Sequence, residues 1–179
     1  YEEAASLPTV FVPSWALLKR RAELKPWETV LVISASGGVG TAAIQVAKNV
    51  IGARVIATTS TEEKAVMARE LGADEVIVYS KEDVAERCKE LTGGRGVDVV
   101  VDHVGSDVWD AAFGSLAEGG RYGICGVTSG YRAELQMGQL FIRSQTVMGI
   151  FMGRQDDLRQ VVEMAGRGLV RGIIHQTFP

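Results

Sequence analysis

Residues 34 to 40, Ser-Ala-Ser-Gly-Gly-Val-Gly, have the composition and spacing of a turn that can hold a phosphate group. The apolar run 30–33 before them predicts a buried parallel strand, and the pattern of 41–48 after them predicts a helix. A strand, a glycine-rich turn and a helix in this order direct backbone N–H groups and the positive end of the helix dipole at one point. A diphosphate fits there, so we expect these residues to bind it: Ser36, Gly37, Gly38, Val39 and Gly40.

This turn departs from the GxGxxG fingerprint at the first position. When the motif is aligned on Gly37 and Gly40, that position holds Ala35, which still allows a tight turn. An ordinary glycine-rich turn without a ligand is the alternative interpretation of these residues taken alone. The strand–helix–strand context favours the ligand.

The residues that follow the second predicted strand indicate which dinucleotide would bind. An NAD-specific site usually has a carboxylate there, but this chain has Thr59 and Ser60. Hydroxyl groups and a nearby cation suit a 2′-phosphate, and Thr59, Ser60 and Lys64 supply them, with Tyr79 as a further phenolic donor. Alternatively, Ser60 is only the N-cap of a helix, in a capping box with Glu63, and Lys64 is only a solvated side chain.

Apolar runs alternate with helical patterns along the chain, and this alternation predicts an α/β fold. The expected strands are 29–34, 54–58, 75–78, 98–102, 121–126 and 145–150, and the expected helices are 13–24, 38–50, 61–71, 82–91, 106–117, 137–143 and 154–167. Glycines at 72, 93–94 and 119–120 are expected where helices end. We therefore predict a Rossmann fold in one domain over residues 1–179, with a doubly wound parallel six-stranded sheet in the order 3-2-1-4-5-6.

In such a sheet a ligand crosses the carboxyl ends of the first and fourth strands, where the strand order reverses. The loops at that edge supply the remaining candidates for cofactor binding: His103 and Val104 after the fourth strand, Gly126 and Val127 after the fifth, and Met152 and Gly153 after the sixth. His103 either contacts the cofactor or is a loop histidine bonded to backbone. Asp102 is expected to accept structural hydrogen bonds and not to act as a base.

Composition excludes several functional classes. The net charge is −3, from 19 basic and 22 acidic residues, which argues against a nucleic-acid binder. Cys88 and Cys125 lie in no metal-binding pattern and are expected in the core. Neither a signal peptide nor a membrane-spanning segment is evident, so we expect a cytoplasmic protein without a membrane partner.

Several segments together resemble the cofactor domain of the medium-chain dehydrogenase/reductase superfamily, in its zinc-type alcohol dehydrogenase-like and quinone oxidoreductase branch. They are residues 24–32, 35–40, 42–48, 70–74, 94–100 and 116–121. The resemblance implies an NADP(H)-dependent oxidoreductase that moves a hydride between nicotinamide and a carbonyl, quinone or activated alkene. It also implies that the loop 151–153 approaches the nicotinamide.

The chain departs from the family pattern in three ways. The barrel-like catalytic domain is absent and the chain opens on Tyr1, so we expect a fragment of a longer protein in which no catalytic residue can be assigned. Residues 7–13 lack the metal-ligand cysteine of zinc-dependent members, so a catalytic zinc does not follow from the resemblance. Trp27 replaces the usual glycine after Pro26, and we expect its ring to be exposed.

Two other functions remain open. One is a non-catalytic nucleotide-binding or sensing module on the same fold. The other is a methyltransferase that uses S-adenosylmethionine, although the ends of the first two strands, Ile33-Ser34 and Thr58-Thr59, lack the acid that it usually needs.

One prediction concerns assembly. The last strand, 145–150, is apolar and uncharged and would lie at the edge of the sheet, so we expect a homodimer through this strand. The other expected partner is a small-molecule substrate.

Overall fold

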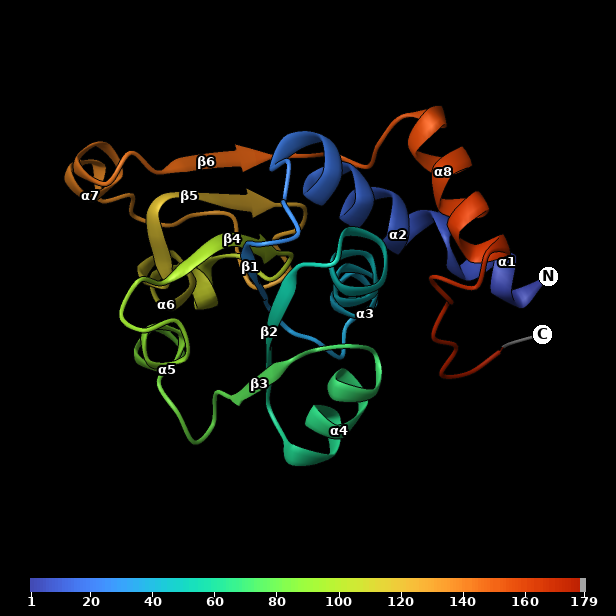
Figure 1. The fold of residues 1–179 in the computed structure, drawn as a ribbon, viewed down its shortest axis with the longest axis horizontal. Coiled ribbons are helices and arrows are strands. Elements are labelled where there is room, and N and C mark those ends of the chain that lie inside the picture. Colours follow the sequence, from blue (N-terminus) through green and yellow to red (C-terminus); the bar gives the residue numbers. More distant parts are fainter. Residues whose placement is uncertain (178–179) are drawn as a thin grey trace.

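A six-stranded parallel sheet forms the centre of the molecule in a computed structural model that describes residues 1–177. The strands lie in the order β3-β2-β1-β4-β5-β6 (Figure 1). Their bounds are β1 (Thr29–Val32), β2 (Arg54–Thr59), β3 (Glu75–Val78), β4 (Val97–Asp102), β5 (Leu116–Ile124) and β6 (Thr146–Gly149). The predicted Rossmann topology is confirmed, with β1 and β4 as neighbours.

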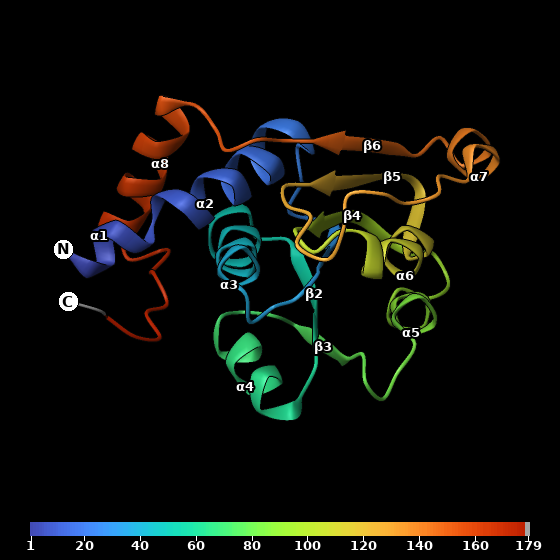
Figure 2. The ribbon, with the colours of Figure 1, turned by 180° about the vertical axis from the view of Figure 1, so that it is seen from behind.

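Helices cover both faces of this sheet. They are α1 (Glu2–Ser6), α2 (Pro8–Trp15), η1 (Ala16–Arg21), α3 (Gly38–Gln45), η2 (Val46–Ile51), α4 (Glu62–Glu70), α5 (Val84–Leu91), η3 (Ser106–Val108), α6 (Trp109–Gly114), α7 (Met137–Ile142) and α8 (Gln155–Gly166). Figures 1 and 2 show α2, α3 and α4 on one face and α5 and α6 on the other, with α8 packed on α2. No helix within residues 1–177 has the length and apolarity needed to cross a bilayer.

The alternation of side chains along the central strands divides the core into two clusters. Val30 and Val32 of β1 face the cluster under α2 and α3, whereas Leu31 faces the cluster under α5 and α6. All three side chains are fully buried, as expected for a strand covered on both faces. Cys88 is buried in the second cluster, as predicted, and Cys125 packs against the first.

The predicted helix 106–117 is wrong in its last turn. The helix ends at Gly114, and Leu116 and Ala117 begin β5 with both side chains buried. Along the β4–β5 pair, β5 advances from Leu116 to Arg121 while β4 advances only from Val97 to Val99. Gly119, with φ at 70°, lies in this irregularity and does not end a helix, because the start of β5 pairs with β4 first.

Two other local predictions are corrected. The N-cap of α4 is Thr61, whose hydroxyl accepts a bond from the Lys64 amide at 3.4 Å, so the predicted capping box of Ser60 and Glu63 does not form. The opening helical region begins at Glu2 and not at residue 13, because Pro8 stands in a first helical turn, where its missing N–H costs nothing.

Candidate functional site

The turn after β1 is tied to the end of β2. Ser34 has φ at 55°, and its amide donates to the Thr58 hydroxyl at 3.0 Å. The next amide, of Ala35, donates to the Thr58 carbonyl at 2.8 Å. These bonds bring the chain sharply round to the start of α3, and the strand ends at Val32 although the apolar run continues through Ile33.

Free backbone donors gather at the N-terminus of α3. Its N-cap, Gly37, is extended and gives no side-chain cap. The amides of Gly38, Val39 and Gly40 have no acceptor among residues 1–177. The first helical hydrogen bond of α3 runs from the Thr41 amide to the Gly37 carbonyl. These donors and the positive end of the helix dipole form an anion site that fits a diphosphate.

The glycines of this turn are required by close approach. A β-carbon on Gly40 would overlap the carbonyl oxygen of Ser34, because α3 packs directly on the turn. A β-carbon on Gly37 would lie 2.9 Å from Nε2 of His103. The structure thus places His103 against the glycine-rich turn after β1, as the strand order predicts.

His103 stands between this turn and the turn after β5. A β-carbon on Gly126 would lie 2.9 Å from the His103 carbonyl oxygen. Nδ1 of the imidazole is buried and has no hydrogen-bond partner in the described chain. Burial lowers the pKa of His103, and the nearby Asp102 carboxylate opposes that shift.

Asp102 anchors the loop that carries His103. Its carboxylate is buried and accepts bonds from the amides of Val104 at 2.7 Å and Gly105 at 3.1 Å. Its second oxygen accepts a bond from the Tyr122 hydroxyl at 2.9 Å. The expected structural role of Asp102 is confirmed, but its partner Tyr122 was missed because nothing in the sequence of β5 marks it.

The residues predicted to bind a 2′-phosphate do not all lie together on the surface. Lys64 Nζ lies 3.3 Å from the Ser60 hydroxyl on the surface, and no carboxylate within residues 1–177 forms an ion pair with this ammonium group. Tyr79, at the end of β3, is half exposed. Thr59 is turned into the protein, with 2% of its surface exposed, and its hydroxyl has no hydrogen-bond partner within residues 1–177.

A cleft of about 440 Å³ lies on the α5–α6 side of the sheet, between the segments that follow β1, β3 and β4. Ile33, Val104 and Val108 give it apolar walls, and Tyr79 and Asp107 also line it. The remaining lining residues are Ser34, Thr58, Glu82, Asp83, Val84, Ala111 and Ala112. Its walls come from segments far apart in sequence, so no local motif could predict it.

The loop after β6 is held in place by Asp157 of α8. Asp157 accepts bonds from the Arg154 amide at 2.7 Å and from the Arg20 guanidinium at 3.0 Å. A β-carbon on Gly153 would lie 2.9 Å from the same Asp157 oxygen, and Met152 has φ at 53°. Gly153 is therefore fixed against α8, and the neighbouring Phe151 is exposed.

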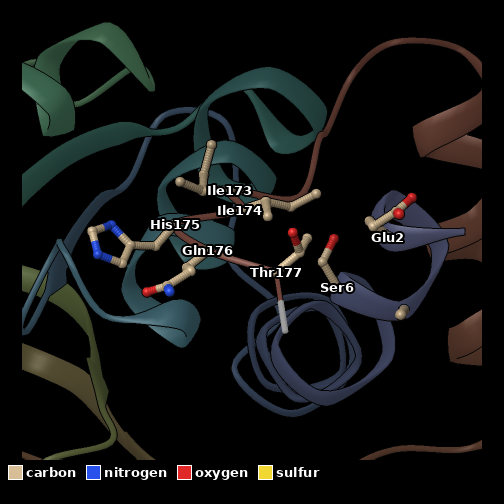
Figure 3. Close-up of a pocket in the computed structure, with 8 residues that line it drawn as sticks. Glu2, Ser6, Ile173, Ile174, His175, Gln176 and Thr177 are labelled. Atoms are coloured by element: carbon tan, nitrogen blue, oxygen red, sulfur yellow. The ribbon is translucent and has the colours of Figure 1, made fainter. Parts of the chain in front are cut away.

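A second pocket lies where the two ends of the described chain meet (Figure 3). Its volume is about 530 Å³, and the residues labelled in Figure 3 line it: Glu2, Ser6, Ile173, Ile174, His175, Gln176 and Thr177. It contains none of the predicted site residues. Trp27 is 80% exposed, as expected, and lies in neither of the two pockets.

Comparison with known proteins identifies the family. Residues 38–167 match the family model described as zinc-binding dehydrogenase. Quinone oxidoreductase-like protein 2 of Bos taurus is 38% identical over 152 residues, which cover 85% of this chain and 44% of that protein.

Solved structures agree with this match. An NAD-dependent alcohol dehydrogenase has a TM-score of 0.90 at 37% identity, covering 96% of this chain and 50% of that one. A mycobacterial protein complexed with NADPH has a TM-score of 0.85 at 32% identity, covering 93% and 54%. The chain thus spans about half the length of these relatives.

The description of the matching family names zinc. Within residues 1–177 no three His, Cys, Asp or Glu side chains lie close enough together to hold a metal ion. The family match and the relatives together show that the chain belongs to the zinc-binding dehydrogenase family, in the alcohol dehydrogenase and quinone oxidoreductase branch of the medium-chain dehydrogenase/reductase superfamily.

Proposed function

We propose that this chain is the NADP(H)-binding portion of an oxidoreductase that moves a hydride between nicotinamide and a carbonyl, quinone or activated alkene. The three free amides of α3 support a diphosphate there. The names of the relatives, quinone oxidoreductase-like protein and alcohol dehydrogenase, support hydride transfer. When bound, the cofactor would supply the hydride, and the chain's share is to hold and orient it.

The choice of NADP(H) over NAD(H) depends on one observation. The ammonium group of Lys64 lies beside the Ser60 hydroxyl without a carboxylate partner in the described chain, and neither Thr59, the last residue of β2, nor either of the two residues after it is an acid. A carboxylate at that point would bond the ribose hydroxyls of NAD and repel a 2′-phosphate, whereas this pair can bind the phosphate. The relatives do not decide the matter, because one is named for NAD and another was solved with NADPH.

Calorimetric titration with NADPH and NADH tests this assignment. We expect Lys64→Met to weaken NADPH binding about 10- to 100-fold, the value of a charge-assisted hydrogen bond of roughly 1.5–3 kcal/mol. NADH binding should change little, because NADH has no 2′-phosphate. Lys89→Met is the matched control, because this exposed lysine lies in the last turn of α5, at the other end of that helix from the cleft, and it should leave both affinities unchanged. A wild-type preference for NADH would refute the NADP(H) assignment.

A further inference from the structure

The partly buried imidazole of His103 has an unusual environment for a histidine in a loop. Neither nitrogen makes a hydrogen bond to any residue in 1–177, and Nδ1 is fully enclosed while Nε2 is not. A histidine bonded to backbone, the structural alternative, is therefore not what the fold contains. The side chain is free to bond a ligand.

The position of Nε2 indicates which ligand group it would meet. It lies 2.9 Å from the point that a β-carbon on Gly37 would occupy. Gly37 occupies the second of the three glycine positions of the motif. That position must lack a side chain so that the backbone can approach a diphosphate. Nε2 therefore packs against Gly37, in the turn that leads into the free amides of α3.

The enclosure of Nδ1 decides where the proton resides. A neutral imidazole carries one N–H, and a buried N–H without an acceptor costs more than a bare nitrogen lone pair. Nδ1 has no acceptor in the described chain, so the proton belongs on Nε2. The same argument opposes an imidazolium, since its second N–H would be buried at Nδ1 without a partner.

The charges around His103 also favour the neutral form. Burial lowers its pKa, and Asp102 opposes this, but the Asp102 carboxylate already accepts three hydrogen bonds. The thiol of Cys125, the first residue after β5, is neutral, because burial raises its pKa to about 12. From α3, the positive end of the helix dipole faces the site and disfavours a further positive charge.

We propose that His103 binds the diphosphate of the cofactor as a neutral hydrogen-bond donor through Nε2–H, and so completes the amide site of α3. This role rests on the proposed function. It predicts that the histidine contributes to NADH and NADPH binding alike, whereas Lys64 contributes only to NADPH binding.

Titration of His103 variants provides the first test. His103→Leu removes the donor and should weaken NADH and NADPH binding equally, by about tenfold. His103→Gln retains an N–H donor and should recover most of that loss, which a purely space-filling role does not predict. Circular dichroism verifies that each variant is folded.

Nitrogen NMR of the wild-type chain provides the second test. The chain contains two histidines, so the exposed His175 serves as an internal control and His175→Gln assigns the signals. We expect His103 to carry its proton on Nε2 between about pH 6 and pH 8, and saturation with NADH to shift its Nε2 signal without adding a second proton. NADH is the suitable probe, because the 2′-phosphate of NADPH itself titrates near about pH 6.

Three results would overturn the inference. They are a proton on Nδ1, conversion of His103 to imidazolium on NADH binding, and unchanged NADH affinity in folded His103→Leu. Each of these leaves dinucleotide binding by α3 intact. Absence of NADH and NADPH binding at every pH would overturn the proposed function as well.

Discussion

Single atoms decide much of this site. The α3 amides are free because Gly37 gives no side-chain cap, and α3 reaches the turn because Gly40 has no β-carbon. The free amides of this turn could be predicted from the sequence, since a strand–turn–helix unit brings its own amides to one point. The inward orientation of Thr59 could not be predicted from the sequence, because it depends on how the end of β2 packs.

At this scale we predict that Gly40→Ala destabilises the protein. The added methyl group would overlap the Ser34 carbonyl oxygen, which is backbone and cannot rotate away. We expect a loss of about 1–3 kcal/mol in the free energy of unfolding, the usual cost of overpacking, measured by urea denaturation. Gly138→Ala in α7 is the control, because no atom lies within 4 Å of the place that its methyl group would take, and an unchanged or slightly higher stability is expected. Equal stability of the two variants would contradict the close-packing argument.

Neighbouring elements of the sheet are joined at their amino ends by carboxylates. Asp98 of β4 accepts a bond from the Thr29 amide that begins β1, at 2.8 Å, and a bidentate pair from Arg95. Asp74, just before β3, accepts a bond from the Val55 amide of β2 in the same way. These bonds satisfy strand-end donors that the ladders leave free.

We therefore predict that Asp98→Asn lowers stability in a pH-dependent way. Burial alone would raise the pKa of Asp98, but the Arg95 and Thr29 bonds outweigh it and the pKa is lowered. Its contribution is complete above the unfolded-state pKa of about 4 and disappears as the pH falls through the lowered folded value. At neutral pH we expect a loss of about 1–3 kcal/mol, shrinking as the solution is acidified below about pH 4.

Asp156→Asn is the matched control for that measurement. Asp156 pairs with Arg159 on an exposed face of α8, so its loss should cost less than about 0.5 kcal/mol at any pH. Urea denaturation at a series of pH values measures both variants. A pH-independent loss in Asp98→Asn would mean that the carboxylate charge does not matter there.

The helix prediction over 106–117 illustrates the limit of local patterns at the scale of elements. Residues 115–117 suit either a helix or a strand, and pairing of Leu116 with Val97 decides for the strand. Such pairing joins residues distant in sequence, and helical periodicity contains no information about it.

At the scale of the whole molecule, the sheet that residues 1–177 form has two edge strands, β3 and β6. β6 has no neighbour on its outer side within the described chain, and the exposed side chains of Met137, Phe141 and Ile142 lie on the adjacent α7. We propose that the chain forms a homodimer through β6, since an uncharged edge strand readily pairs with a second copy.

Sedimentation velocity tests this assembly. Wild-type chain should sediment as a dimer, and Thr146→Lys, which places a charge on the exposed edge, should weaken the dimer about tenfold or more. Val162→Lys, on an exposed face of α8, should leave it unchanged. A wild-type monomer at high concentration would exclude this dimer.

The sequence by itself determined the class of fold, the order of the strands and the glycine-rich turn between β1 and α3. Those features follow from short-range patterns: buried runs, helical periodicity and glycines between them. Only the tertiary structure decided that Thr59 is buried, that Asp102 bonds Tyr122, and that Nε2 of His103 lies against Gly37 of the glycine-rich turn. Each of these depends on side chains from strands far apart in the chain, and their contacts exist only once the sheet has assembled.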